Sequence, residues 1–155
     1  MYLWLKLLHV IAVVAFLGNI ITGLYWHAHA ARTRDARLIA HAIDGIIRSD
    51  RIFTVPGVLL IVTTGLATAM VGGFPILGTP WILWSLILFI VSGIAFVARV
   101  APLQKQLLAL VRNQQDPASL DWERYQTVAR RWELWGALAL ATPLGALVLM
   151  ILKPS

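Results

Sequence analysis

The sequence contains no cysteine, and this absence removes several classes of site at once. Disulfides, thiolate zinc sites, iron–sulfur clusters and covalently attached c-type haem all require cysteine, so they are excluded. Haem held without a covalent bond, and copper bound by histidine or methionine, remain open.

Charged residues are also scarce, because Asp, Glu, Lys and Arg make up 13% of a chain that is 59% hydrophobic. Soluble domains contain about 45–50% apolar residues. Four apolar runs cover residues 3–24, 52–71, 80–97 and 134–152. Each approaches the ~20 residues with which a helix crosses the hydrocarbon core of a bilayer. We therefore predict one all-α domain, residues 1–155, folded as a bundle of four transmembrane helices.

The basic residues are unevenly distributed and indicate the orientation of the bundle. Of the 13 Lys and Arg residues, 11 lie in segments 25–51 and 98–133, and the connection 72–79 carries no charge. The positive-inside rule places both basic segments in the cytoplasm. We predict an N-out, C-out protein of a bacterial cytoplasmic membrane, with helices extended on the cytoplasmic side. The net charge of +6 lies mainly in these segments and is no sign of nucleic-acid binding.

Three further features concern the ends of the spans. The first run has no basic segment before it and is longer than the apolar part of a signal peptide, so we expect it to be retained. Residues 39–47 have the pattern of an amphipathic helix, which either leads into the second span or lies on the membrane. Residues 113–119 predict a turn. Asp50 is expected to cap the second span or to pair with Arg99.

His9 is the only histidine in the four apolar runs. A titratable side chain inside a membrane is costly and is therefore a candidate functional residue. Lys6 precedes it by three residues and shares its helical face. His9 either binds a cofactor or forms a hydrogen bond with a neighbouring helix, for example at Thr64 or Ser92.

Helical rise predicts which residues lie at the depth of His9. Met70 and Met150 are at a comparable depth in the outer leaflet, and Lys153 lies just above Met150. A compact bundle would enclose His9, Met70 and Met150 in one pocket with Lys6 and Lys153 at its rim. The aromatic residues expected to pack against a cofactor there are Phe16, Trp81, Trp84 and Phe89.

This set of residues suits two cofactors. The iron of haem b takes histidine or methionine axially, and its propionates favour lysine at the mouth of a pocket. Cu(I) prefers thioether and imidazole ligands. We predict haem b, with copper as the alternative at His9, Met70 and Met150. A second axial ligand would be a methionine or the His9 of a second copy in a homodimer.

The other three histidines, His27, His29 and His41, lie in the first cytoplasmic segment. His27 and His41 would face each other if the turn between them were central, which leaves a second metal site open. The alternative is that these histidines are solvated at the membrane interface.

Several short motifs follow one another along the chain. They are Lys6-x-x-His9, Asp50-Arg-Ile-Phe-Thr-Val-Pro-Gly57, Thr64-Gly65, Trp81, Gln104 and Met150-x-x-Lys153-Pro154. With them the chain resembles, over nearly its whole length, a bacterial family of small integral membrane proteins of unknown function. More remotely, the Lys-x-x-His start is similar to the first span of protoporphyrinogen oxidases of the J type and of copper-resistance D proteins. That resemblance implies that His9 is a haem-ligand position.

Three functions follow as hypotheses. The first is a haem b-binding redox protein that passes electrons to or from a quinone or a protein partner. The second is a cofactor-free accessory or scaffold subunit of a larger membrane complex. The third is copper handling at the same histidine and methionines. The sequence departs from the oxidase-like pattern because the spans contain no second histidine, and cofactor binding is therefore expected rather than catalysis. No residue pattern supports phosphoryl transfer or hydrolysis by a catalytic triad.

Overall fold

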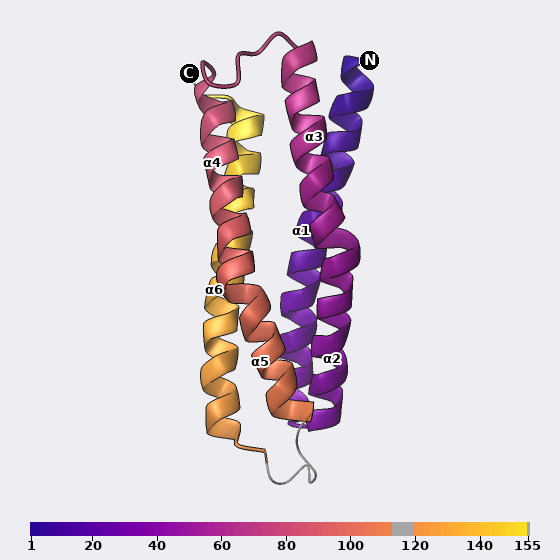
Figure 1. Ribbon diagram of the computed structural model, residues 1–155, viewed down its shortest axis with the longest axis vertical. Coiled ribbons are helices and arrows are strands. Elements are labelled where there is room, and N and C mark those ends of the chain that lie inside the picture. Colours follow the sequence, from indigo (N-terminus) through magenta and orange to yellow (C-terminus); the bar gives the residue numbers. More distant parts are fainter. Residues whose placement is uncertain (113–119, 155) are drawn as a thin grey trace.

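The computed structural model describes residues 1–112 and 120–154, and all regular elements in these ranges are helices (Figure 1). The turn predicted at residues 113–119 lies outside the described residues. In chain order the elements are α1 (Tyr2–Thr33), α2 (Ala36–Ser49), η1 (Asp50–Thr54), α3 (Val55–Val71), α4 (Pro80–Ala95), η2 (Phe96–Val100), α5 (Ala101–Arg112) and α6 (Trp122–Leu152).

The elements η1 and η2 are single π-helical turns that join α-helices without a break. α2, η1 and α3 form one continuous helix, Ala36–Val71, and α4, η2 and α5 form another, Pro80–Arg112. Together with α1 and α6 they give four helices that are long and apolar enough to cross a membrane. The predicted all-α bundle of four long apolar helices is confirmed, and every helix extends beyond its predicted span at the end that the sequence predicts to be cytoplasmic.

The connection between α1 and α2 is set by its local sequence. α1 ends at Thr33, because the next residue, Arg34, has a φ of 53° in the left-handed region. Asp35 then caps α2, because its carboxylate accepts hydrogen bonds from the amides of Arg37 at 2.8 Å and Leu38 at 3.4 Å. The apolar face of the amphipathic helix α2 is buried in the bundle. Of the two predicted positions for this helix, it therefore continues into the second span and does not lie on the membrane surface.

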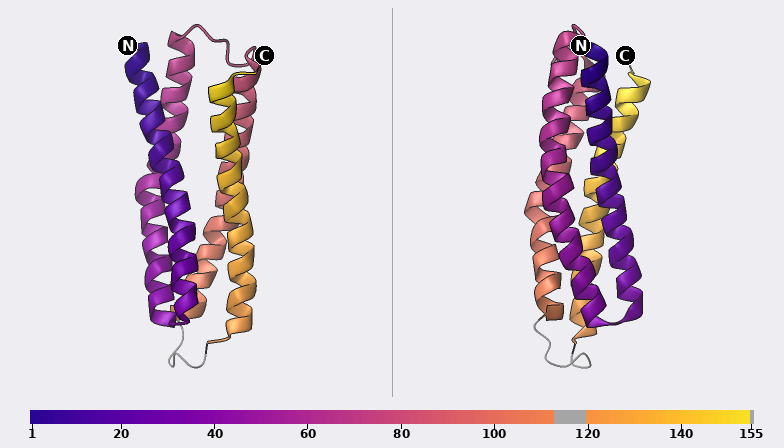
Figure 2. Two further views of the ribbon diagram at one scale, coloured as in Figure 1. Left: turned by 180° about the vertical axis from the view of Figure 1, so that it is seen from behind. Right: turned by 90° about the vertical axis from the view of Figure 1, so that its right-hand side faces the viewer.

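Packing differs between the two halves of the bundle. In the half predicted to be cytoplasmic, α2 packs on α5 and on α1, and α5 packs on α6. The larger hydrophobic core lies there, and it includes the fully buried Ile39, Leu107 and Tyr125. In the other half, predicted to be the outer one, α1 pairs with α3 and α4 pairs with α6. Figure 2 shows these two pairs standing apart at the end that carries the chain termini.

Asp50 lies between the two halves, at the π-helical turn η1, and is buried. Its carboxylate accepts hydrogen bonds from Asn19 Nδ2 at 2.9 Å, Thr54 Oγ1 at 2.8 Å and Gln104 Nε2 at 2.9 Å. These donors come from α1, η1 and α5. The sequence-based prediction that Asp50 caps the second span or pairs with Arg99 is therefore wrong. The helix runs through Asp50, so its side chain points inward and joins three helices.

Both chain termini and the 72–79 connection lie at the same end of the molecule (Figure 1). Large hydrophobic side chains such as Leu3, Leu59 and Val97 are exposed around the bundle. Such exposure in helices of this length is expected for a surface that contacts lipid. The four-helix bundle thus belongs in a lipid bilayer.

Candidate functional site

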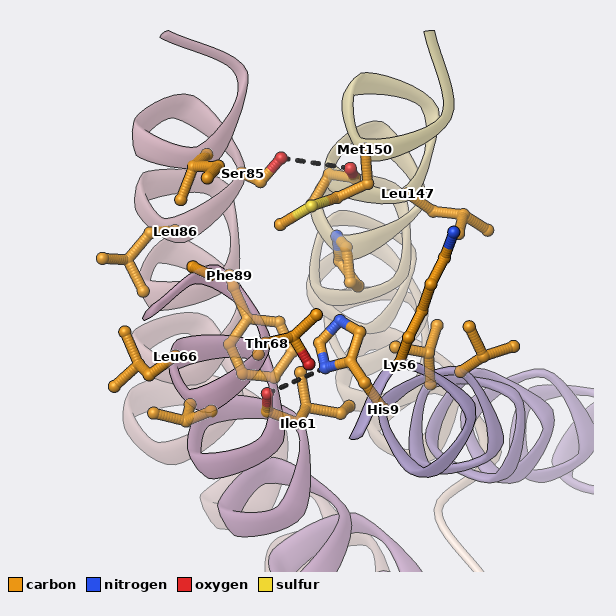
Figure 3. A pocket seen from close by; sticks show the side chains of 18 of the residues that line it. Lys6, His9, Ile61, Leu66, Thr68, Ser85, Leu86, Phe89, Leu147 and Met150 are labelled. Atoms are coloured by element: carbon orange, nitrogen blue, oxygen red, sulfur yellow. Dashed lines mark hydrogen bonds between the residues drawn. The ribbon is translucent and has the colours of Figure 1, made fainter. Parts of the chain in front are cut away.

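The His9 imidazole projects from α1 and is anchored to α3. Its Nδ1 atom lies 3.0 Å from the carbonyl oxygen of Ile61 and 3.2 Å from Thr64 Oγ1. Figure 3 shows the first of these bonds, with the rest of the ring directed toward the space between the helices. Of the two polar partners predicted from sequence, Thr64 is found and Ser92 is not. Ser92 instead donates to the carbonyl oxygen of Ala139 at 2.6 Å.

The partners of Nδ1 determine which ring nitrogen carries the proton. A backbone carbonyl accepts hydrogen bonds only, and the Thr64 hydroxyl donates its own hydrogen to the Leu60 carbonyl. Nδ1 must therefore be the N–H donor. The neutral imidazole then has its lone pair on Nε2, the ring nitrogen that does not bond to Ile61 or Thr64. An Nδ1–H bonded to a backbone carbonyl is the usual arrangement of a histidine that ligates a metal through Nε2.

Gly65 provides the room for this ring. A Cβ atom at position 65 would lie 3.0 Å from His9 Cε1 and 3.3 Å from His9 Nδ1. Contacts at this distance force a neighbour to move by a few tenths of an ångström. The close approach of α1 to α3 at this point thus depends on the absence of a side chain.

His9 lines a cavity of about 550 Å³ between the two helix pairs. This volume is in the range of sites for cofactors and drug-sized ligands, roughly 300–1,000 Å³. The wall is mostly apolar and is contributed by α1, α3, α4 and α6. It includes Val13, Leu17, Leu66, Leu86, Phe89 and Leu147.

The polar atoms of the wall are largely engaged. Thr68 Oγ1 donates to the Thr64 carbonyl at 2.6 Å, and Ser85 Oγ donates toward the Trp81 and Ala146 carbonyls. Within the described part of the chain, His9 Nε2 has no hydrogen-bond partner. The cavity therefore offers a ligand the imidazole lone pair within largely apolar walls.

Four of the five residues predicted from depth line this cavity together: Lys6, His9, Met150 and Lys153 (Figure 3 labels the first three). Met70 does not line the cavity, so the prediction that it lies beside His9 is wrong. Its side chain is 73% exposed on the outer surface of α3. The reason is helical rotation, because the preceding residue, Ala69, faces the cavity and successive residues differ by about 100°.

The mouth of the cavity combines lysine and aromatic side chains. The ammonium group of Lys153 lies 5.4 Å from the ring centroid of Trp81. Deeper in, the rings of Phe16 and Phe89 are in contact, with centroids 5.6 Å apart. Trp84, predicted to join them, is 58% exposed and lies outside the cavity.

The cytoplasmic histidines are not brought together. His27 is buried against α6, where Nε2 lies 3.1 Å from the Tyr125 hydroxyl, whereas His29 and His41 are exposed. In residues 1–112 and 120–154 no three His, Asp or Glu side chains are placed to hold a metal ion. The metal site considered for His27 and His41 is thus not formed by these two residues.

Sequence reasoning missed the contributions of the Ile61 carbonyl, Gly65 and the polar cluster at Asp50. Gly65 follows a threonine in an apolar run, which signals close helix packing without revealing its partner. Comparison with curated proteins gave no match, and neither did comparison with solved structures. A family model described as "predicted integral membrane protein (DUF2269)" matches residues 3–154. Because the match spans almost the entire chain, this protein is a member of that family of integral membrane proteins.

Proposed function

We propose that the cavity around His9 binds haem b and that the protein is a redox protein of a bacterial cytoplasmic membrane. The observation that carries this proposal is the fixed imidazole, with Nδ1 bonded to the Ile61 carbonyl and Nε2 open to the cavity. A lone pair suits a Lewis acid such as iron. It does not suit a quinone carbonyl, which needs a hydrogen-bond donor.

The rest of the cavity is compatible with this cofactor. Its apolar walls would suit a macrocycle, and Lys6 and Lys153 at the mouth would pair with the propionates. Met150 would be a second residue holding the haem, and the His9 of a second copy is the alternative. Bound haem would supply one-electron chemistry, with a quinone or a protein partner exchanging electrons outside this cavity.

An absorption spectrum of the purified protein, made in cells supplied with a haem precursor, tests the proposal. We expect a Soret band with about one haem per chain. His9→Ala should abolish it, whereas His29→Ala, which removes an exposed histidine of the same helix, should leave it unchanged. Lys6→Gln should weaken haem retention several-fold, because one charge-assisted contact is lost.

The alternatives predict different outcomes of the same experiment. Stoichiometric copper that is lost in His9→Ala and in Met150→Leu, without a Soret band, would replace haem by copper handling. Absence of both haem and copper, with co-purification of other membrane subunits, would support an accessory role in a larger complex. A Soret band that survives His9→Ala would overturn the assignment of the ligand.

A further inference from the structure

The cavity at His9 has two long edges, because it lies between two helix pairs that stand apart (Figure 2). One edge is formed by α1 and α6, and the other is formed by α3 and α4. α1 and α6 meet farther from the chain termini, where Leu24 lies against Gly136 and His27 bonds to Tyr125. At the level of His9 the cavity lies between them. The two edges differ in exposure and in charge, which indicates where a ligand can enter.

The edge between α1 and α6 is the more exposed one. Lys6, Val10 and Val14 follow one another at intervals of four residues, so they form one ridge along α1. All three line the cavity and are exposed, Val14 to 66%. On α6, Ile151 lines the cavity as well and is 68% exposed. The wall of the cavity thus continues onto the outer surface of the bundle at this edge.

The edge between α3 and α4 is less exposed and carries no charge. Leu66 lines it and is 37% exposed, and Leu86 is half-buried. Residues 52–98 contain no Asp, Glu, Lys or Arg, so this edge has no partner for the charged end of a ligand. Figure 3 shows Leu66 and Leu86 on one side of the cavity and Lys6 on the other. An anionic ligand is therefore matched by the edge between α1 and α6.

The end of the cavity nearest the chain termini is closed in part by the 72–79 connection. Phe74 and Ile76 of this connection line the cavity. The ring of Phe74 meets that of Trp81 edge-on, with centroids 5.7 Å apart. A large ligand that entered at this end would have to move these side chains, whereas it would pass exposed valines at the edge between α1 and α6.

We infer that haem enters the cavity sideways from the lipid, through the opening between α1 and α6. The inference rests on the proposed function, because it takes haem as the ligand. Val10, Val14 and Ile151 border this opening and belong to the apolar surface that contacts lipid, so a macrocycle can pass between them without meeting water. Lys6 and Lys153, nearer the chain termini, supply the charge that attracts the propionates to this edge.

The rate of haem uptake tests the route. Haemin is added to phosphatidylcholine vesicles that contain the haem-free protein, and the Soret band is followed in time. Val10→Trp narrows the opening and should slow uptake about tenfold, with the same amount of haem bound at saturation. Ile11→Trp is the matched control, because Ile11 is an exposed neighbour on α1 outside the cavity, and it should leave the rate unchanged. Equal rates in both variants, or a larger effect of Leu66→Trp at the other edge, would overturn the inference.

A photoreactive lipid tests the opening without haem. Vesicles of phosphatidylcholine with a diazirine on one acyl chain are irradiated with the haem-free protein, and mass spectrometry of peptides locates the label. Leu17 lines the cavity and is buried, so an acyl chain can label it only from inside. We expect label at Leu17 in the wild type and in Ile11→Trp, and its loss in Val10→Trp.

The two experiments separate the inference from the proposed function. Haem binding without label at Leu17 would leave haem as the ligand and overturn the side opening. Label at Leu17 in a protein that binds no haem would support the opening, overturn the proposed function and replace haem by a lipid chain as the occupant.

Discussion

Replacement of Gly65 by alanine would place a methyl group against the His9 imidazole, and this substitution tests the geometry of the outer site directly. The new Cβ atom would lie 3.0 Å from Cε1 and 3.3 Å from Nδ1. The ring must shift, because the backbone of α3 is held by its own helical hydrogen bonds. A shift lengthens the bond from Nδ1 to the Ile61 carbonyl, now 3.0 Å.

Two opposing effects set the magnitude for Gly65→Ala. Overpacking costs about 1–3 kcal/mol, and loss of the hydrogen bond costs about 1 kcal/mol. Alanine is favoured over glycine inside a helix by about 1 kcal/mol. The free energy of unfolding should therefore fall by about 1–3 kcal/mol in the wild-type background.

A double-mutant cycle with His9→Ala isolates the contact. Once the imidazole is gone, alanine at position 65 has space, so Gly65→Ala should then stabilise the protein by up to about 1 kcal/mol. The two backgrounds should thus differ by about 2–4 kcal/mol, at the upper end of the interaction energies found for residues in contact. The assay is reversible unfolding of the purified protein in detergent.

Gly18→Ala provides the control, since a Cβ atom there would have nothing within 4 Å. It should be neutral or stabilising in both backgrounds. If Gly65→Ala stabilises the wild type as much as Gly18→Ala does, the close contact of His9 with α3 does not exist. The argument for the orientation of Nε2 would then fail with it.

Three other substitutions should change the unfolding free energy, measured in the same assay. Asp50→Ala leaves the amide donors of Asn19 and Gln104 without their buried acceptor and should cost about 3 kcal/mol or more, whereas Asp50→Asn, which keeps one acceptor oxygen, should cost less. Equal effects would show that the carboxylate is not the centre of the cluster. Tyr125→Phe removes the only hydrogen-bond partner of His27 among the described residues and should cost about 1–3 kcal/mol. Ser92→Ala should cost about 0.6 kcal/mol, typical of hydrogen bonds between helices in a membrane.

The four long helices and the level of His9 along the bundle could be predicted because hydropathy and helical rise act along one axis. Lys6 and His9 were placed on one face by their spacing of three, and they line the same cavity. Rotation about the helix axis was not predictable. It depends on how neighbouring helices pack, and it placed Met70 on the outer surface while Ala69 faces the cavity.

Side-chain contacts between residues far apart in the chain were also not predictable from the sequence. Gln104 reaches Asp50 across 54 positions, and His27 meets Tyr125 across 98. Asp50 was expected to act at a helix end because a charged run precedes an apolar one. The π-helical turn lets the helix continue through this residue, so the carboxylate enters the bundle. The place of Asp50 at the start of an apolar run could be read from the sequence, but the donors that bond to its buried carboxylate could not.

The two halves of the bundle suit different tasks, and Asp50 lies where they meet. Below it, the core around Leu107 and Tyr125 holds α1, α2, α5 and α6 together. Above it, α1 and α3 pack on each other, as do α4 and α6, which leaves the cavity between the pairs. The bond from Gln104 to Asp50 joins the two helix pairs at the base of this opening. The core around Leu107 and Tyr125 can therefore hold the fold while the two helix pairs above it remain far enough apart to leave the cavity at His9.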